Sequence, residues 1–234
     1  IYPHKEIKNL KSKYSVSEIK HMSMEENEDE ASKVIAPERT KAVPRFRKGV
    51  DEEVKGTLRG TAYHRFFEIL NYDCCKDYNS IEEYLKASVA AGKISEEYAG
   101  LINLKRFEEF LQTDLGKRMG SAYKKGLLFR EQPFIMELGA DMIDKEYPSD
   151  EKILVQGIVD AFFFEDDKVY IVDYKTDRVE QGKAGEKALV ERYHKQLELY
   201  ADTISRVTGK ETGGCYIYST CLKKEILIES PSYT

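Results

Sequence analysis

The chain has 234 residues, of which 41% are hydrophobic and 34% charged, so it is long enough to bury a core without disulfide or metal staples. Its 37 basic and 42 acidic residues give a net charge of -5, which excludes a nucleic-acid binder that works by bulk positive charge alone. Apolar runs such as residues 161–164 are far too short to cross a bilayer, which excludes a membrane span.

The four cysteines are placed as an adjacent pair, Cys74 and Cys75, and a separated pair, Cys215 and Cys221. This spacing matches neither a disulfide framework nor a zinc site, so we expect reduced thiols and a cytoplasmic location. Because the sequence begins at Ile1 without a signal-peptide pattern, we expect it to be a piece of a longer protein.

The first 55 residues are uneven in composition. Residues 15–20 could start a short helix, and an acidic block follows at residues 25–30. A basic stretch follows, with two prolines nearby, and its charged residues are Arg39, Lys41, Arg45, Arg47 and Lys48. It is either a solvated connector or a contact for a phosphate backbone. We therefore expect residues 1–55 to be an N-terminal helix and a charged, partly mobile linker, and residues 56–234 to be the folded domain.

Helical patterns dominate the first half of that domain. Leu58, Ala62, Phe66 and Ile69 recur at helical spacing, which predicts a helix over residues 57–72. Residues 80–83 read as a capping box that starts another helix, and helical periodicity continues to about residue 119.

Strand patterns follow. The sequence predicts strands over residues 126–138, 153–165 and 168–175, then a helix over residues 187–207 that ends at Gly209. Two last strands are expected at residues 214–220 and 225–229. This order predicts the α/β class, with one mixed central β-sheet flanked by helices.

Two aspartates lie in strands that are otherwise apolar. If Asp166-Asp167 is the tip of an even-length hairpin loop, Asp160 faces Asp173 across the two strands, and Lys175 shares the face of Asp173. Like charges in directly opposed positions destabilise a sheet, so the pair needs a reason. A divalent cation between them supplies one, with the lysine placed where a phosphate or an attacking water lies. The bare pattern of Asp, a gap and Asp-x-Lys is weak by itself, because acids and lysines are common here.

Two polar residues on predicted helices fit the same site. Gln196 interrupts an apolar face of the helix over residues 187–207, so it either bonds to a backbone carbonyl in the core or points toward Asp173 and Lys175. A lone His64 is usually a surface residue, and it becomes a plausible metal ligand only beside the acid pair.

Four segments together resemble the RecB-type nuclease domain of the AddA subunit of bacterial helicase-nucleases, a branch of the PD-(D/E)XK nuclease superfamily. They occur in one order along about residues 56–218: Gly60-Thr61-Ala62-Tyr63-His64, Gln156-Gly157-Ile158-Val159-Asp160, Asp173-Tyr174-Lys175-Thr176-Asp177 and Gln196-Leu197-Glu198-Leu199-Tyr200. The joint pattern is specific, although no single segment is. The resemblance implies a PD-(D/E)XK nuclease-like fold.

The resemblance also implies residue roles. His64, Asp160 and Asp173 would be metal ligands, completed by the Tyr174 carbonyl, and Lys175 would orient or activate the attacking water. Gln196 and Tyr200 match the family's Gln-x-x-x-Tyr element, which supports the site and nearby DNA. Glu131 resembles an acid on the preceding strand that reaches the metal through water. No Gly-x-x-x-x-Gly-Lys-[Ser/Thr] motif occurs, so the chain lacks the ATP site of a complete helicase-nuclease.

The sequence thus predicts hydrolysis of DNA phosphodiesters with Mg²⁺ or Mn²⁺, as the nuclease domain of a helicase-nuclease in double-strand break end processing and recombinational repair. Expected partners are DNA, single-stranded or at ends, the helicase portion of the parent chain and a second nuclease subunit, and no membrane. Two alternatives stay open: a catalytically silent nuclease fold that binds DNA or a partner, and a hydrolase of small phosphate esters.

Overall fold

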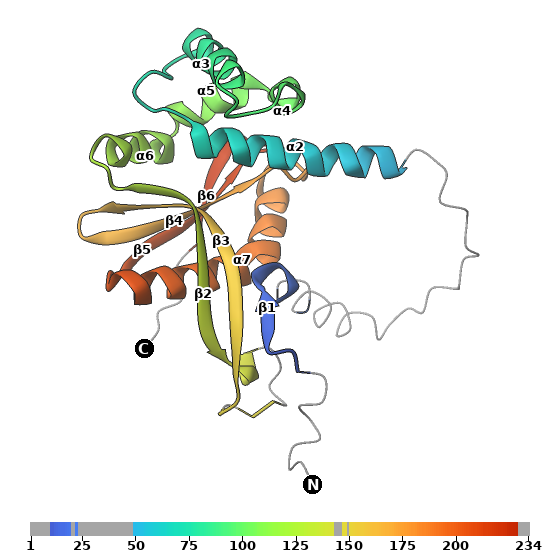
Figure 1. Cartoon of the computed structure of the whole chain (residues 1–234), viewed down its shortest axis with the longest axis vertical. Coiled ribbons are helices and arrows are strands. Elements are labelled where there is room, and N and C mark those ends of the chain that lie inside the picture. The colour runs from blue at the N-terminus through green and yellow to red at the C-terminus, as the bar shows by residue number, and fades with distance from the viewer. Residues whose placement is uncertain (1–9, 20–21, 23–48, 143–146, 149, 229–234) are drawn as a thin grey trace.

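The protein is described as a computed structural model that covers residues 10–19, 22, 49–142, 147–148 and 150–228. It contains one six-stranded mixed sheet with helices on both faces, as the sequence predicts (Figure 1). The acidic block at residues 25–30 and the basic stretch at residues 39–48 lie outside the described residues. No helix in the described part of the chain combines the length and the apolar character needed to span a membrane.

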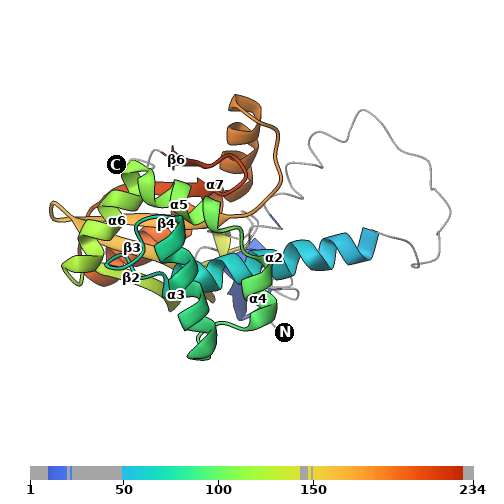
Figure 2. The ribbon, with the colours of Figure 1, turned by 90° about the horizontal axis from the view of Figure 1, so that it is seen from above.

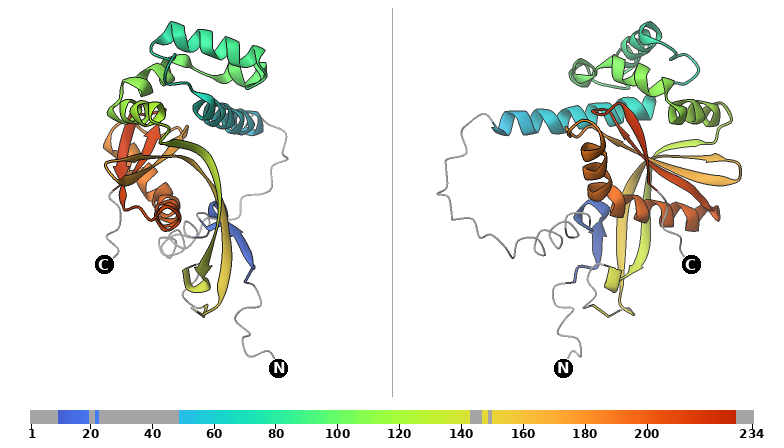
Figure 3. Two further views of the ribbon diagram at one scale, coloured as in Figure 1. Left: turned by 60° about the vertical axis from the view of Figure 1, so that its left-hand side comes forward. Right: turned by 180° about the vertical axis from the view of Figure 1, so that it is seen from behind.

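Strand β3 (Lys152–Glu165) is the longest strand and organises the sheet. The antiparallel strand β2 (Leu128–Gly139) runs along one of its edges. The other edge pairs with two strands in turn: the parallel β1 (Lys13–Ser15) at residues 154–156, and the antiparallel β4 (Lys168–Lys175) at residues 161–165. Figure 3 shows how strongly the long β2–β3 hairpin curves. Among the described strands, none pairs with residues 157–160 on that second edge, so this short segment of β3 lies between β1 and β4 without a strand partner there.

The β3–β4 hairpin has the predicted register. Glu165 pairs with Lys168, and the ladder continues to Ala161 opposite Val172. Asp166 and Asp167 both have positive φ, at 49° and 64°, as a two-residue hairpin turn of type I′ requires. The hairpin register predicted from the sequence is therefore confirmed over these pairs.

Helix α7 (Lys183–Thr208) connects β4 to the parallel strand β5 (Thr212–Ser219), which then pairs with β6 (Lys224–Ile228). Its buried side chains, among them Leu189, Leu197 and Ile204, join one hydrophobic cluster with β3 and β4. Gly209 ends the helix in the left-handed conformation, at φ 67°, as expected for a glycine C-cap.

The opposite face of the sheet is covered by helices that precede β2 in the chain (Figure 2). They are α2 (Gly49–Ile69), α3 (Tyr78–Ala90), α4 (Glu96–Leu101), α5 (Leu104–Gln112) and α6 (Asp114–Lys124). Their core is aromatic: the ring of Phe67 on α2 stacks on that of Tyr174 on β4, with centroids 3.9 Å apart. This stack fixes α2 over the carboxyl end of β4.

Some predicted boundaries are wrong. Helix α3 begins one turn before the predicted capping box, because Asp77 is its N-cap and the side chains of Asp77 and Ser80 satisfy each other's backbone N–H groups. Helix α2 begins at Gly49, not at residue 57, and ends at Ile69. Strand β1 was not expected at all, and it joins the sheet from the segment before residue 56. The division of the chain at that residue stays a prediction.

Candidate active site

Three acidic side chains stand in a row across β2, β3 and β4. The β2–β3 register pairs Arg130 with Ala161 and Gln132 with Val159, so Glu131 is opposite Asp160. Extending the β3–β4 register by one step places Asp173 opposite Asp160 on the other side. The row is thus set by strand register and needs no long loop to assemble it.

Glu131 has an unusual backbone. Its φ is 49°, in the left-handed region that non-glycine residues adopt rarely. Such a conformation costs roughly 1–2 kcal/mol in an L-residue and is concentrated at functional sites. It interrupts the β2–β3 pairing at the position of Asp160 and puts the Glu131 carboxylate into the row.

The β3–β4 ladder opens at Asp160. The Tyr174 N–H, which would otherwise continue the ladder, donates to Asp160 Oδ2 at 2.8 Å. In a strand the N–H and C=O of one residue point to the same edge, so the Tyr174 carbonyl also faces Asp160. The carbonyl that the family resemblance implies as a ligand therefore faces the acid row.

His64 reaches the row from helix α2. Its Nδ1 lies 3.3 Å from Asp160 Oδ1, and its ring meets that of Tyr174 edge-on at 6.2 Å. One ligand atom each from His64, Glu131 and Asp160 lie within 4.8 Å of one another. The three form a cluster of the size that one metal ion needs, and His64 is not the isolated surface residue of the alternative reading.

Asp173 is held differently from the other two acids. It is fully buried, its Oδ1 accepts a hydrogen bond from Gln196 Nε2 at 2.9 Å, and its Oδ2 lies 2.6 Å from Lys175 Nζ. Lys175 forms a close ion pair with Asp173, and because a carboxylate oxygen can accept more than one hydrogen bond, Oδ2 keeps acceptor capacity. Gln196 Nε2 also lies 3.0 Å from the Tyr200 hydroxyl, so the Gln-x-x-x-Tyr element contacts the row as a unit.

Burial and charge move the pKa values of these groups apart. Burial, with the charge of Asp160, raises the pKa of Glu131 to about 7 and that of Asp173 to about 6. Burial opposes ionisation of Asp160 too, but the hydrogen bond and charge of His64 outweigh it and lower its pKa. Burial likewise opposes the charged form of Lys175, yet Asp173 and Asp160 raise its pKa, so Lys175 keeps its proton at neutral pH.

The donor set suits a hard divalent cation. Carboxylate and carbonyl oxygens are the ligands preferred by Mg²⁺ and Mn²⁺, and the row offers them together with one imidazole nitrogen. A dication would also relieve the unfavourable burial of Glu131 and Asp173. Among the described residues, His64, Glu131 and Asp160 are the group of three that could hold an ion, whereas the family resemblance groups His64 and Asp160 with Asp173 and gives Glu131 an outer role.

Sequence reasoning missed a supporting pair beside Lys175. Asp177 accepts hydrogen bonds from Arg192 at 2.8 Å and from the Tyr193 hydroxyl at 2.9 Å. The Lys175 ammonium lies 4.1 Å from the centroid of the Tyr193 ring, a cation–π contact. Tyr193 lies on the apolar face of α7 that Gln196 interrupts, and its hydroxyl gives no signal in that sequence pattern.

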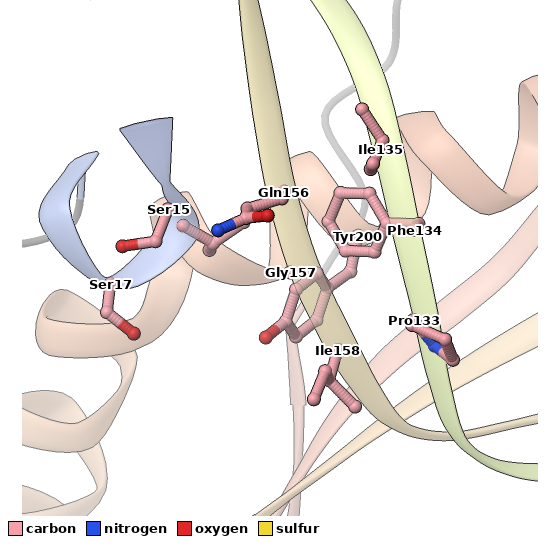
Figure 4. Close-up of a pocket in the computed structure, with 10 residues that line it drawn as sticks. Ser15, Ser17, Pro133, Phe134, Ile135, Gln156, Gly157, Ile158 and Tyr200 are labelled. Atoms are coloured by element: carbon pink, nitrogen blue, oxygen red, sulfur yellow. The ribbon is translucent and has the colours of Figure 1, made fainter. Parts of the chain in front are cut away.

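A separate apolar cavity of about 880 Å³ lies on the β1 side of the row (Figure 4). Phe134, Ile158 and Tyr200 line it, and none of the three acids does. At its wall a Cβ on Gly157 would come within 2.9 Å of both Phe134 and Val16, which explains the glycine in the Gln156-Gly157 segment. This cavity is adjacent to the row, and Tyr200 is the one site residue described above that lines it.

Comparison with known proteins identifies the class. The model of the PD-(D/E)XK nuclease superfamily matches residues 39–230, so the chain belongs to this superfamily. This confirms the family resemblance and the fold class predicted from the sequence.

Individual relatives show which members of the superfamily this chain is similar to. The A subunit of the ATP-dependent helicase/nuclease of Clostridium perfringens (strain SM101 / Type A) is 34% identical over 241 residues, which cover 97% of this chain and 19% of that protein. The protein of the same name from Thermoanaerobacter sp. (strain X514) is 35% identical over 224 residues, which cover 93% and 17%. This chain therefore spans less than a fifth of the length of these relatives.

Proposed function

We propose that this chain is a divalent-metal-dependent deoxyribonuclease that hydrolyses phosphodiester bonds. The observation that carries the proposal is the acid row beside a protonated, largely buried Lys175, with His64 at 3.3 Å from the central acid. A row of acids in a sheet destabilises the protein unless a bound cation offsets the repulsion, so the row indicates a cation site. Phosphodiester hydrolysis uses it, because the reaction needs a site for a cation next to a positive charge that faces the phosphate.

The position of each residue in the site indicates its role. His64, Glu131 and Asp160, with the Tyr174 carbonyl and Asp173, would hold Mg²⁺ or Mn²⁺, and the bound ion would stabilise negative charge on the phosphate. Lys175 stays protonated, and its ammonium group donates a hydrogen bond to the attacking water or to a phosphate oxygen. Gln196 fixes Asp173, and Asp173 in turn fixes the Lys175 ammonium. Lys175 therefore orients the water and stabilises charge, and it is not the base in this state.

We infer the setting of the reaction from the ATP-dependent helicase/nuclease relatives. The domain would act on DNA single strands or ends, as part of a longer cytoplasmic protein that also carries a helicase portion and associates with a second nuclease subunit. In that setting it would process double-strand break ends for recombinational repair.

One assay separates this proposal from its two rivals. The purified chain is incubated with plasmid, linear single-stranded DNA and p-nitrophenyl phosphate, each with Mg²⁺, Mn²⁺ or EDTA. We expect DNA cleavage with either ion and none with EDTA, and no release of nitrophenol. DNA binding without cleavage would support the silent binding module, and hydrolysis of the small ester alone would support the third reading. An Asp160→Asn preparation, purified in parallel, controls for contaminating nucleases.

A further inference from the structure

A second, polar cavity of about 510 Å³ lies on the α2 and α5 side of the acid row. Elements far apart in the chain form it: α2, the start of α5, the end of β4 and the turn after β5. We call it the arginine pocket, and its lining residues are Arg59, Tyr63, Leu101, Asn103, Arg106, Thr176, Arg178, Thr220 and Cys221. Three of these side chains are guanidinium groups, and none of the described lining residues is an acid.

The arginine pocket is joined to the acid row through the backbone. Thr176 directly follows Lys175, and Tyr63 directly precedes His64. The Thr220 N–H donates to the Lys175 carbonyl at 2.9 Å, and Arg59 Nη2 donates to the Thr176 carbonyl at 3.1 Å. The pocket thus begins one residue beyond Lys175, at the carboxyl ends of the parallel strands β4 and β5, where open α/β sheets bind their ligands.

The positive charge of the arginine pocket is largely uncompensated. In the part of the chain that the structure describes, neither Arg59 nor Arg178 has a carboxylate within 4.0 Å. Arg106 Nη1 is 3.6 Å from Glu109, makes no hydrogen bond and is buried, while Glu109 also binds Lys223 at 2.7 Å. A guanidinium has five N–H donors, so Arg178 and Arg59, which uses Nη2 for the Thr176 carbonyl, keep donors for a ligand.

We propose that the arginine pocket binds a phosphate of the DNA strand next to the phosphate that is cut. The inference rests on the nuclease function proposed above and adds the place at which the protein binds the DNA strand. Guanidinium forks bind phosphate oxygens in bidentate fashion, and the Thr176 hydroxyl and the Asn103 amide add neutral donors. Such a subsite gives the chain a local positive field although its net charge is -5.

The first test measures binding and not cleavage. Affinity of a fluorescent single-stranded oligonucleotide is measured by anisotropy in Ca²⁺ over a series of salt concentrations. Arg59→Gln and Arg178→Gln should each weaken binding roughly tenfold at low salt and lower the salt slope by about 0.7. The matched control is Arg206→Gln, an exposed arginine on α7 paired with Asp202, which should change neither. Arg178→Gln is the decisive variant, because Arg59 also holds the Thr176 backbone.

The second test locates the phosphate. A set of oligonucleotides carries one uncharged methylphosphonate linkage at successive positions. The wild-type chain should lose affinity at one position beside the cut, and Arg178→Gln should lose nothing further at that position while responding normally elsewhere. If the loss of affinity caused by Arg178→Gln and the loss caused by the methylphosphonate add up at every position, including the one beside the cut, the proposal is wrong.

Failure of the subsite and failure of the nuclease function look different. If the wild type cuts DNA and the pocket variants bind and cut as it does, the nuclease function stands and the arginine pocket is not a subsite. If the pocket variants bind more weakly but no preparation cuts DNA, the arginine pocket binds a DNA phosphate but the nuclease function is wrong. With both correct, Arg178→Gln should raise KM about tenfold and leave kcat at saturating DNA unchanged.

Discussion

The two halves of the β3–β4 hairpin differ in what their pairing achieves. From Ala161 to Glu165 the ladder is complete and its centre is aromatic, with Phe163 stacked on Tyr170 at a centroid distance of 5.2 Å. One residue further, at Asp160 and Asp173, ladder bonds give way to side-chain bonds and the face becomes acidic. Backbone pairing and ring stacking stabilise this first, closed half, whereas opposed acids disfavour the second, open half around Asp160 and Asp173.

The comparison predicts that substitutions in the open half change activity and leave the fold intact. Asp160→Asn has the largest expected effect, a loss of at least about 10³-fold in cleavage, because it removes the central charge of the row. Asparagine keeps an acceptor for the Tyr174 N–H, so the melting temperature should stay within a few degrees of wild type. Cleavage rates and circular dichroism melts check both statements. A variant that cuts normally would contradict the assignment of Asp160.

Lys175→Gln should lower kcat by about 10² to 10³-fold, since a positioned donor to a developing charge is worth that much. The matched control is Lys168→Gln at the other end of the same strand, where the lysine pairs with Glu211 at the surface. Single-turnover cleavage by both variants compares the open and closed halves directly. Equal rates would assign Lys175 a structural role only.

Phe163→Ala should show the opposite behaviour. Phe163 is fully buried, and such truncations cost about 3–5 kcal/mol. For a chain of this size the melting temperature should fall by roughly 6–20 °C. Cleavage per folded molecule at low temperature should stay close to wild type. A large loss of rate without loss of stability would show that the closed half does more than support the site.

The smallest effect concerns pH. Glu131 and Asp173 bind a proton more tightly in the folded chain than in the unfolded chain, because their pKa values are raised to about 7 and about 6. Without metal, stability should therefore fall as pH rises from about 4 to 7. Glu131→Gln should flatten part of this fall and raise stability at pH 8 by about 1–2 kcal/mol, allowing for its partial exposure. Urea unfolding at several pH values measures it, and an unchanged pH dependence would contradict the raised pKa of Glu131.

Much of this arrangement could be predicted from the sequence. The Asp166-Asp167 turn fixes the register, so the opposition of Asp160 and Asp173 follows from counting residues. The interruption of an apolar helix face by Gln196 indicates a polar contact, which the structure shows to be Asp173. Both signals are local, because a turn type and a helical period depend only on neighbouring residues.

What was missed depends on contacts between distant segments. The residue type of Glu131 does not predict its left-handed backbone. That conformation occurs where β2 lies beside Asp160 of β3, so it depends on a contact between distant segments. Strand β1 has only three residues, too few for a period, and its partner is about 140 residues away by sequence number. The arginine pocket combines four separate segments, none of which has a recognisable motif.

Strand β1 has a practical consequence for anyone who trims this chain. Tyr14, Val16 and Ile19 in and beside it are buried, and its backbone covers residues 154–156 of β3. A fragment that starts at residue 56, where composition suggests a natural cut, would leave nine consecutive residues of β3, 152–160, without a partner on one edge among the described strands. Open edges recruit other strands, so that fragment should self-associate through the strand that carries Asp160. A peptide spanning residues 10–22, added in trans, should compete with this association and keep the fragment monomeric.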